Sequence, residues 1–169
     1  MIRLGAGCKV NLGLRVLGRR PDGYHELDSV FWPLAAPRDE LEIRLAPGAD
    51  ITVRCDVPGI DPTRNTLTKA HAAFTALTGE APGLEVTLKK RIPSGAGLGG
   101  GSSDAAALLL WLNSRLARPL SREQLGQAAL SVGADVPFFL YGRPSRVRGI
   151  GERVEPLPEP FPHLFLVLV

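Results

Sequence analysis

The sequence predicts one α+β domain, in which strands and helices are mixed rather than strictly alternating. Its 169 residues, 44% of them hydrophobic and 22% charged, have the length and composition of a single globular domain. The first 55 residues show mainly the two-residue apolar period of strands. Helical spacing begins only near residue 65, and strand-like sequence returns between the helices. This order favours α+β over a doubly wound α/β fold.

Strands account for the N-terminal region. Between residues 10 and 16, apolar Val and Leu alternate with Asn, Gly and Arg, which is typical of a strand. A polar turn over 18–23 separates this strand from the next one. Further strands are expected at 27–34, 41–45 and 51–55.

Three helices are expected after residue 64. The first begins at Asn65 and Thr66, where apolar residues start to recur at helical spacing, and it ends near Gly79. The second is strongly apolar and spans roughly 104–116. The third begins with the capping box Ser-Arg-Glu-Gln at 121–124 and ends at the glycine at position 133.

Strand-like sequence surrounds these helices. One strand is expected over 84–92, and shorter strands are expected after Gly133. The last residues, 164–169, form an apolar run without a polar tail, whereas natural termini are usually exposed. We therefore expect residues 1–163 to form one domain and residues 164–169 to begin a connection to a further domain. The alternative is that 164–169 are the final core strand of a self-contained domain.

Composition excludes several classes of protein. No apolar run reaches about eighteen residues, so no membrane span is expected. The N-terminus lacks the layout of a signal peptide, and two cysteines, Cys8 and Cys55, are too few for a disulfide framework. We therefore expect a cytoplasmic protein. The net charge of +3 suits an anionic small molecule and does not indicate a nucleic-acid partner. The sequence does not determine an oligomeric state.

A glycine-rich loop before the second helix is the most informative segment. Five glycines lie within seven residues, at positions 95, 97, 99, 100 and 101. Ordering such a loop is costly, because glycine loses the most conformational freedom on folding. Ser102 and Ser103 follow at the expected start of the helix, where free N–H groups and the positive end of the helix dipole converge. This arrangement predicts a phosphate site. The alternative is a flexible turn with a serine cap.

The loop departs from two common phosphate-binding motifs. It lacks the Gly-Lys-Ser/Thr ending of a Walker loop. Gly95-x-Gly97-x-x-Gly100 matches the dinucleotide fingerprint literally, but that fingerprint requires an acidic residue on a second strand about twenty residues later. Here that position falls within 118–123, at a turn and the start of a new helix. A dehydrogenase is therefore rejected.

Lys9 and Asp135 are two residues with a candidate chemical role. Only four of the 20 basic residues are lysines, and Lys9 lies in an apolar strand beside Asn11. A compact ammonium suits a phosphate or an acceptor hydroxyl, although an edge lysine that points to water is the alternative. Asp135 lies among apolar residues, where a carboxylate needs a partner. A partner such as Lys9 would keep it ionised, and an ionised aspartate near an acceptor hydroxyl can act as a general base. The alternative is an aspartate that caps a turn.

Tyr24 and His25 follow the polar turn between the first strands. An aromatic ring and an imidazole can stack on a base and contact its polar edge, although a hairpin turn with partly exposed aromatics is more common for an isolated pair. His71 and His163 have no evident partners in the sequence, and no cluster of metal ligands is present in it.

Together these segments resemble the GHMP kinases, small-molecule kinases without a Walker loop. The segment 93–105 is similar to their ATP-phosphate motif. Four further segments, at 9–14, 18–27, 133–139 and 149–152, occur in the order seen in the GHMP kinases of the non-mevalonate isoprenoid pathway. The segment Asp-Gly-Tyr-His separates that group from the mevalonate, homoserine and galactose kinases. The resemblance implies the GHMP kinase N-terminal domain, which is like ribosomal protein S5 domain 2, with helices packed on one face of a mixed sheet.

The resemblance also implies roles for individual residues. Lys9 and Asp135 would be the catalytic pair at the acceptor hydroxyl. The residues implied in substrate binding are Asn11, Tyr24, His25, Phe31, Gly149 and Glu152. Among these, Tyr24 and His25 would hold a cytosine. The residues implied in ATP binding are Asn65, Lys90, Pro93, Gly95, Gly97, Leu98, Gly99, Gly100, Gly101, Ser102 and Ser103.

The implied reaction is ATP-dependent phosphorylation of a hydroxyl on a small molecule, a cytidine diphosphate sugar alcohol. Mg²⁺ is expected with ATP, and its ligands are unknown. A GHMP kinase with a different acceptor, or a nucleotide-binding module without turnover, are the alternatives. Two departures from the family pattern stand out. Ala-Gly-Cys-Lys at 6–9 replaces Ala-Pro-Ala-Lys, and nothing in this sequence matches the glycine-serine loop of the family's C-terminal domain.

Overall fold

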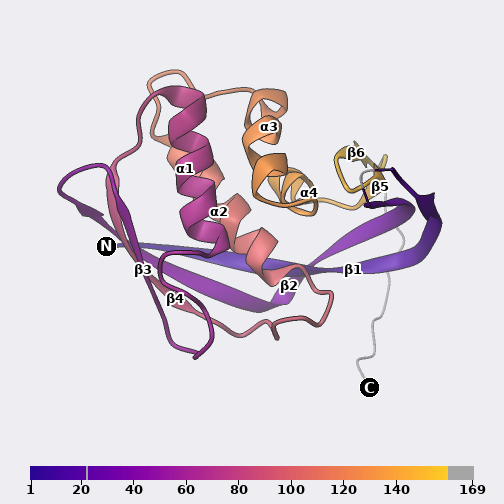
Figure 1. The fold of residues 1–169 in the computed structure, drawn as a ribbon, viewed down its shortest axis with the longest axis horizontal. Coiled ribbons are helices and arrows are strands. Elements are labelled where there is room, and N and C mark those ends of the chain that lie inside the picture. The colour runs from indigo at the N-terminus through magenta and orange to yellow at the C-terminus, as the bar shows by residue number, and fades with distance from the viewer. Residues whose placement is uncertain (22, 160–169) are drawn as a thin grey trace.

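The computed structural model describes residues 1–21 and 23–159, which form a sheet covered by helices (Figure 1). The described residues form β1 (Ile2–Arg19), β2 (His25–Ala46), β3 (Ile51–Cys55), α1 (Thr66–Thr78), β4 (Gly83–Lys89), α2 (Gly100–Ser114), α3 (Arg122–Val132), α4 (Val136–Tyr141), β5 (Ser145–Gly149) and β6 (Arg153–Pro156). The helices gather on one face of the sheet (Figure 1). The predicted α+β fold class is thus confirmed.

The long strand β2 is the centre of the sheet. β1 pairs with it antiparallel along one edge, over almost its full length. Along the other edge, β4 pairs with residues 40–46 and β5 pairs with residues 27–31. β3 lies parallel to β4, and β6 lies antiparallel to β5, so the sheet is mixed as predicted. β2 therefore pairs with β4 near one of its ends and with β5 near the other, and it connects both parts of the sheet.

The sequence predicted two strands where the structure has one. The segments 27–34 and 41–45 both belong to β2. β1 pairs with both of them across a shift in register between Ala6 and Cys8, so the ladder continues through the intervening residues. A sequence period alone does not show that a partner strand bridges such an irregularity.

The predicted strand at 10–16 is part of β1, but the apolar residues at its far end are not buried. Leu14 is 51% exposed and Val16 is 60% exposed. The register of β1 on β2 shifts between Leu12 and Arg15, which breaks the strict alternation of faces. The two-residue period therefore predicted the strand correctly without indicating a buried face.

The predicted starts of α1 and α3 are confirmed by their caps. The side chain of Asn65 accepts hydrogen bonds from two backbone N–H groups of the first turn of α1, and Gly79 ends the helix in the left-handed conformation with φ 83°. In α3, the Ser121 hydroxyl accepts from the Gln124 backbone and the Gln124 side chain accepts from the Ser121 backbone. This is the capping box that the sequence predicted.

Two predictions about the later elements are wrong. α2 begins at Gly100 rather than near residue 104, because Gly99 takes a left-handed conformation with φ 71° and ends the loop there. Residues 136–141 form helix α4 rather than a strand. Pro137 lies in the first turn of that helix, where proline is tolerated. A helix of six residues is too short to show helical periodicity in the sequence.

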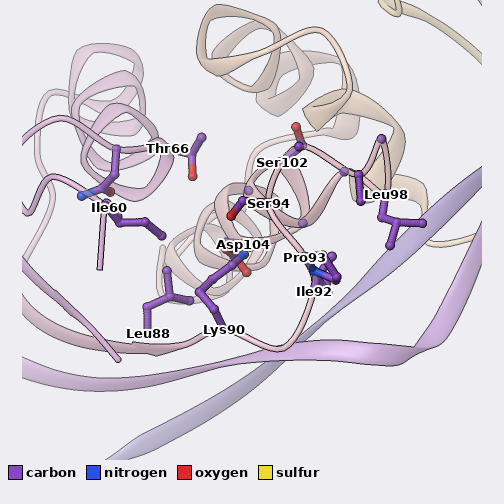
Figure 2. Close-up of a pocket in the computed structure, with 18 of the residues that line it drawn as sticks. Ile60, Thr66, Leu88, Lys90, Ile92, Pro93, Ser94, Leu98, Ser102 and Asp104 are labelled. Atoms are coloured by element: carbon purple, nitrogen blue, oxygen red, sulfur yellow. Dashed lines mark hydrogen bonds and ion pairs between the residues drawn. The ribbon is translucent and has the colours of Figure 1, made fainter. Parts of the chain in front are cut away.

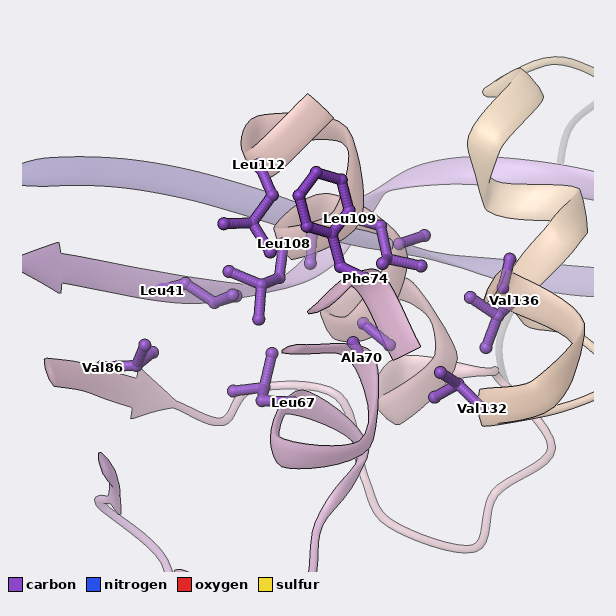
Figure 3. Packing of buried hydrophobic residues seen from close by; sticks show 14 of the residues in the cluster. Leu41, Leu67, Ala70, Phe74, Val86, Leu108, Leu109, Leu112, Val132 and Val136 are labelled. Atoms are coloured by element: carbon purple, nitrogen blue, oxygen red, sulfur yellow. The ribbon is translucent and has the colours of Figure 1, made fainter. Parts of the chain in front are cut away.

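The apolar core lies between the sheet and the helices (Figure 3). Leu41 of β2 and Val86 of β4 contribute the side chains of the sheet. Leu67 and Phe74 contribute from α1, and both are 1% exposed. α2 lies between the sheet and the other helices and buries Ala105, Ala106, Leu108, Leu109 and Leu112. This placement explains why the sequence of α2 is apolar almost all round.

Within the described ranges, no helix combines the length and the apolar character needed to cross a bilayer. The predicted run at 164–169 lies outside the described residues, as does His163.

Shortening the Phe74 side chain tests the position of the core. We predict that Phe74→Ala lowers the free energy of unfolding by about 3–5 kcal/mol, because it leaves a cavity between α1 and α2. Urea unfolding measures the difference. Leu77→Ala on the same helix is the control: Leu77 is 36% exposed, and its truncation should cost less than about 1.5 kcal/mol. Equal losses for the two variants would contradict this core.

Candidate functional site

A cavity of about 490 Å³ opens beside the glycine-rich loop and the start of α2 (Figure 2). Its wall includes the loop residues 92–102 and the segments 59–61 and 64–66, which lead into α1. The side chains of Lys90 and Asp104 also line it. The predicted phosphate loop therefore borders a large cavity.

Close packing explains why glycine stands at the end of this loop. A Cβ atom on Gly99 would lie 3.0 Å from the Phe139 ring and 3.3 Å from Lys9 Cγ. A Cβ atom on Gly100 would lie 2.9 Å from Ile92 Cγ2. The loop backbone thus lies directly against β1 on one side and against the segment after β4 on the other.

The start of α2 presents its backbone N–H groups to the cavity. The residue at the N-cap position is Gly99, and no side chain of the described residues caps the helix there. The first-turn residues Gly100, Gly101 and Ser102 line the cavity. Uncapped N–H groups and the positive end of a helix dipole form a site for an anion such as phosphate. The alternative of a simple serine cap is wrong for this helix.

Lys9 connects β1 to three other parts of the molecule. Its backbone N–H donates to the Leu98 carbonyl oxygen of the loop at 2.9 Å. Its ammonium donates to Asn11 Oδ1 at 2.8 Å and lies 3.5 Å from Asp135 Oδ2. The same ammonium lies 4.4 Å from the centroid of the Phe31 ring. Lys9 is 3% exposed, so it does not point to water as an edge lysine would.

Asp135 immediately precedes α4, and its side chain is 31% exposed. Its carboxylate makes no cap hydrogen bond to the helix and instead faces the Lys9 ammonium. The turn at 149–152 packs closely against Ala134, the residue before Asp135, because a Cβ atom on Gly151 would lie 2.6 Å from the Ala134 carbonyl oxygen. The structure therefore brings the two predicted catalytic residues together, with one open side.

The turn at 149–152 contains two of the residues implied in substrate binding. Gly149 adopts a left-handed conformation with φ 77°, which favours glycine, and the Glu152 carboxylate lies directly against its backbone. The Glu152 carboxylate accepts a hydrogen bond from the Ile150 backbone N–H at 2.7 Å. Gly149 is buried and Glu152 is half-buried. Both are placed by the packing of this turn, next to the segment that leads to Asp135.

The other residues implied in substrate binding occupy different environments. Asn11 is exposed beside Lys9. Tyr24, 57% exposed, and His25, also exposed, lie at the start of β2, where β1 and β2 form an extended hairpin. Phe31 is 2% exposed and packs edge-on against the Phe138 ring at 5.2 Å. The buried Phe31 ring thus packs against the Lys9 ammonium and offers little surface to a ligand.

Asn65 and Lys90 line the cavity, but their side chains are already engaged. The Asn65 side chain caps α1 with its oxygen, and its nitrogen donates to the Asp61 and Pro62 carbonyl oxygens at 2.8 and 3.2 Å. The Lys90 ammonium is held by two buried carboxylates, those of Asp39 and Asp104. If Asn65 and Lys90 contact a nucleotide, their backbone or apolar atoms therefore make the contact.

The cluster of Asp39, Lys90 and Asp104 was missed at the sequence level. The Asp39 carboxylate accepts from the backbone N–H groups of Arg91 and Ile92 at 2.6 and 2.9 Å, and it also pairs with Lys90. The Lys90 ammonium reaches Asp104 Oδ2 at 3.0 Å. Asp39 stands in a strand without any motif, and its partners lie about fifty residues away, so no local signal indicated it. The cluster fixes the chain just before the glycine-rich loop.

Burial governs the protonation of this cluster. Burial raises the pKa of the Asp104 carboxyl to about 7, against the opposing effect of Lys90 and with a further increase from Asp39. For Lys90, burial alone would lower the pKa, but Asp104 and Asp39 raise it above its usual value. Lys90 is therefore charged at neutral pH, and Asp104 is close to its titration point.

The described residues do not form a cage for a metal ion. They contain no group of three or more His, Cys, Asp or Glu side chains that could hold one. The two carboxylates buried beside the cavity, Asp39 and Asp104, already hold Lys90. Mg²⁺ binds through oxygen ligands and usually retains several waters. The residues of this part of the chain thus do not fit a protein-built magnesium site.

Comparison with known sequences reveals clear relatives. The family described as GHMP kinases N terminal domain matches residues 65–143, from the cap of α1 through α4. The 4-diphosphocytidyl-2-C-methyl-D-erythritol kinase of Nitratidesulfovibrio vulgaris is 50% identical over 167 residues, which cover 99% of this chain and 58% of that protein. The kinase of the same name from Citrifermentans bemidjiense is 44% identical, with 99% and 60% covered. The chain thus spans little more than half the length of these curated relatives.

Solved structures give the same picture. A crystal structure of 4-(cytidine 5'-diphospho)-2C-methyl-D-erythritol kinase aligns with a TM-score of 0.75 at 41% identity, over 94% of this chain and 56% of that chain. A homoserine kinase from Cytophaga hutchinsonii aligns with a TM-score of 0.69 at 21% identity, over 94% and 52%. The second likeness shows a shared fold alone.

The raised pKa of Asp104 predicts how stability depends on pH. Between about pH 4 and pH 7 the folded chain binds more protons at Asp104 than the unfolded chain, so the free energy of unfolding falls as pH rises. Asp104→Asn lacks this effect. We predict that the variant gains stability relative to the wild type as pH rises through this window, and that the difference levels off above pH 7.

Urea unfolding of both proteins at several pH values between 4.5 and 8 measures this difference. Glu85→Gln is the control, because Glu85 is exposed on β4 and its substitution should give a nearly constant difference. A stability of Asp104→Asn relative to the wild type that stays constant or falls with rising pH would contradict the raised pKa.

Proposed function

We propose that this chain, which matches the GHMP kinase N-terminal domain over residues 65–143, supplies the nucleotide-binding and catalytic part of a kinase that phosphorylates 4-diphosphocytidyl-2-C-methyl-D-erythritol. The phosphate donor is ATP, and the acceptor is a hydroxyl group of the erythritol moiety. The pathway is the non-mevalonate route to isoprenoids. The observation that carries the proposal is Lys9, which contacts both the glycine-rich loop and Asp135.

The cavity beside α2 holds ATP in this proposal. The backbone N–H groups at the start of α2 bind the phosphates, and the helix dipole offsets their charge. The segments 59–61 and 64–66 form the opposite wall, which suits the adenine nucleoside. Support comes from the uncapped helix start and from glycines that allow the backbone to approach closely.

Lys9 and Asp135 act on the acceptor. The acceptor oxygen attacks the γ-phosphorus of ATP, the bond between that phosphorus and the β–γ bridging oxygen breaks, and ADP leaves. Asp135 accepts the proton of the acceptor hydroxyl. The Lys9 ammonium, 3.5 Å from Asp135, stabilises negative charge on the acceptor oxygen and on the transferring phosphoryl group. Asn11 holds Lys9 and contacts the substrate beside it.

The hairpin of β1 and β2 recognises the cytidine end of the substrate. Tyr24 and His25 are exposed there and have an apolar face and polar atoms to offer to a base. The turn at 149–152 borders the substrate on the side of Asp135, through Gly149 and Glu152. The support is the position of these residues along one continuous edge, since β5 pairs with β2 just beyond His25.

Mg²⁺ is expected to accompany ATP, and when bound it would neutralise phosphate charge. Because the described residues form no cage for it, we assign it no ligand in this chain. We further propose that residues 1–163 act as the N-terminal domain of the kinase, in the cytoplasm, on small molecules.

Removing the proposed base tests the reaction. We predict that Asp135→Asn, made in the longest protein that contains this chain, lowers turnover at least about a hundredfold, because the acceptor loses its proton acceptor. ATP binding should survive, because Asp135 does not line the nucleotide cavity. Steady-state kinetics and calorimetric ATP titration measure the two effects. Asp50→Asn, an exposed aspartate in the turn after β2, is the matched control. Near-wild-type turnover of Asp135→Asn would remove Asp135 from this role.

Ligand competition tests the acceptor. We predict that cytidine diphosphate sugar alcohols bind at least about a hundredfold more tightly than homoserine or mevalonate, because a site built around a base rejects ligands that lack one. Competition binding with these ligands measures the preference. Tighter binding of homoserine or mevalonate would point instead to a GHMP kinase with a different acceptor. Binding without any turnover in the longest protein would point to a nucleotide-binding module.

A further inference from the structure

The cluster of Asp39, Lys90 and Asp104 has a role that the proposed reaction does not use. Its members come from β2, from the residue after β4 and from the first turns of α2, and they meet below the glycine-rich loop. Asp39 is 0% exposed and Asp104 is 1% exposed. Lys90 and Asp104 also form part of the wall of the 490 Å³ cavity (Figure 2). A buried charged cluster thus lies directly beside the proposed nucleotide site.

The two carboxylates of the cluster are not equivalent. Asp39 accepts hydrogen bonds from two backbone N–H groups and from Lys90, so its charge is well compensated. Asp104 contacts Lys90 through Oδ2, and its buried Oδ1 has no hydrogen-bond partner among the described residues. A buried carboxylate with an unpartnered oxygen is the costlier of the two to keep ionised. Asp104 is therefore the place where the cluster binds a proton.

The charged and titratable groups around Asp104 are consistent with Asp104 as the residue that binds the proton. Asp39 faces it from β2 and Lys90 from the segment after β4. The Cys8 thiol of β1, whose pKa is raised by burial and by Asp39, stays neutral. Across the cavity, the wall contains Asp61 and Arg64, one of each sign.

Two further polar side chains come from α1, which packs against α2. Thr66 of α1, which lies near Gly101, is uncharged. The buried His71 of α1 has one ring nitrogen bonded to the Pro82 carbonyl oxygen at 2.9 Å.

We propose that Asp104 takes up a proton when the phosphates of a nucleotide enter the cavity. The cluster then changes from one net negative charge to none, since it comprises two carboxylates and one ammonium. This inference rests on the proposed function, because it requires a nucleotide in the cavity. It makes Asp104 a positioning residue that sets the charge beneath the phosphates without contacting the reacting atoms.

The physical reason is repulsion between like charges. A phosphate in the cavity adds negative charge close to an ionised Asp104, across protein with little water to screen it. Protonation of Asp104 removes that repulsion and leaves Asp39 and Lys90 as a neutral pair. The pKa of about 7 in the empty cavity supports the proposal, because a small further increase moves the carboxyl across neutral pH. Each pKa unit added by the phosphates corresponds to a tenfold preference of the nucleotide for the protonated form.

Calorimetry in two buffers tests the proposal. ADP is titrated without Mg²⁺ into the intact protein at pH 8, in HEPES and in Tris, whose ionisation enthalpies differ. At this pH the phosphates of ADP are already ionised, so the ligand exchanges few protons itself. We expect binding enthalpies that differ between the buffers by the uptake of about half a proton or more per ADP, because Asp104 is mostly ionised before binding.

The variants assign the proton to its residue. Asp104→Asn should bind ADP with the same enthalpy in both buffers, because its side chain cannot titrate. Glu85→Gln, on the exposed face of β4, should keep the uptake of the wild type. Equal enthalpies in the wild type overturn the proposal, and so does uptake that persists in Asp104→Asn. Absence of ADP binding to the wild type would instead overturn the proposed function, so the two failures are distinguishable.

A second measurement needs no variant. The carbon-13 chemical shift of the Asp104 carboxyl, followed from pH 5 to pH 9, reports its protonation directly. We expect the midpoint of this titration to rise by more than about one pH unit when ADP is bound, which is the shift that the uptake of half a proton at pH 8 requires. An unchanged midpoint overturns the proposal, even if Asp104→Asn does not fold.

Discussion

The site depends on one buried lysine. An ammonium removed from water needs partners that compensate its charge, and Lys9 finds them in Asn11, in Asp135 and in the face of the Phe31 ring. Its backbone N–H holds the Leu98 carbonyl oxygen of the glycine-rich loop at the same time. A residue at the middle of β1 therefore determines how far the phosphate loop lies from the proposed base. The phosphate loop and the proposed base are thus both positioned by a strand, which is more rigid than a loop.

Much of this site could be predicted from local sequence, because its signals are local. The caps of α1 and α3 and the five glycines of the loop act within a few residues of themselves. Lys9 and Asp135 were predicted as a pair, but through a resemblance, since no spacing connects residues that distant. Asp39 could not be found, because its meaning comes only from Lys90 and from two backbone groups far along the chain. Helix α4 was missed because a helix of six residues is too short to show helical periodicity in its sequence.

The candidate site has two neighbouring halves, which are the cavity beside α2 and the corner around Lys9. The cavity beside α2 is bounded by loops and by the cluster of Asp39, Lys90 and Asp104. The corner around Lys9 is bounded by β1, α4 and the turn after β5. Gly99 lies between the halves, close to the Lys9 side chain and to the Phe139 ring. In the proposed function, a phosphate bound on one side would meet an acceptor on the other across this narrow contact, as phosphoryl transfer requires.

The strand β2 imposes a constraint on how this protein can change in evolution. Phe31, below the Lys9 corner, and Asp39, below the nucleotide cavity, both lie on β2, and the register of β1 against β2 shifts between them. Insertion or loss of a residue in this stretch would have to be absorbed by that irregularity, because otherwise one of the two residues would turn to the other face of the sheet. The side chains between Phe31 and Asp39 can therefore vary more easily than their number.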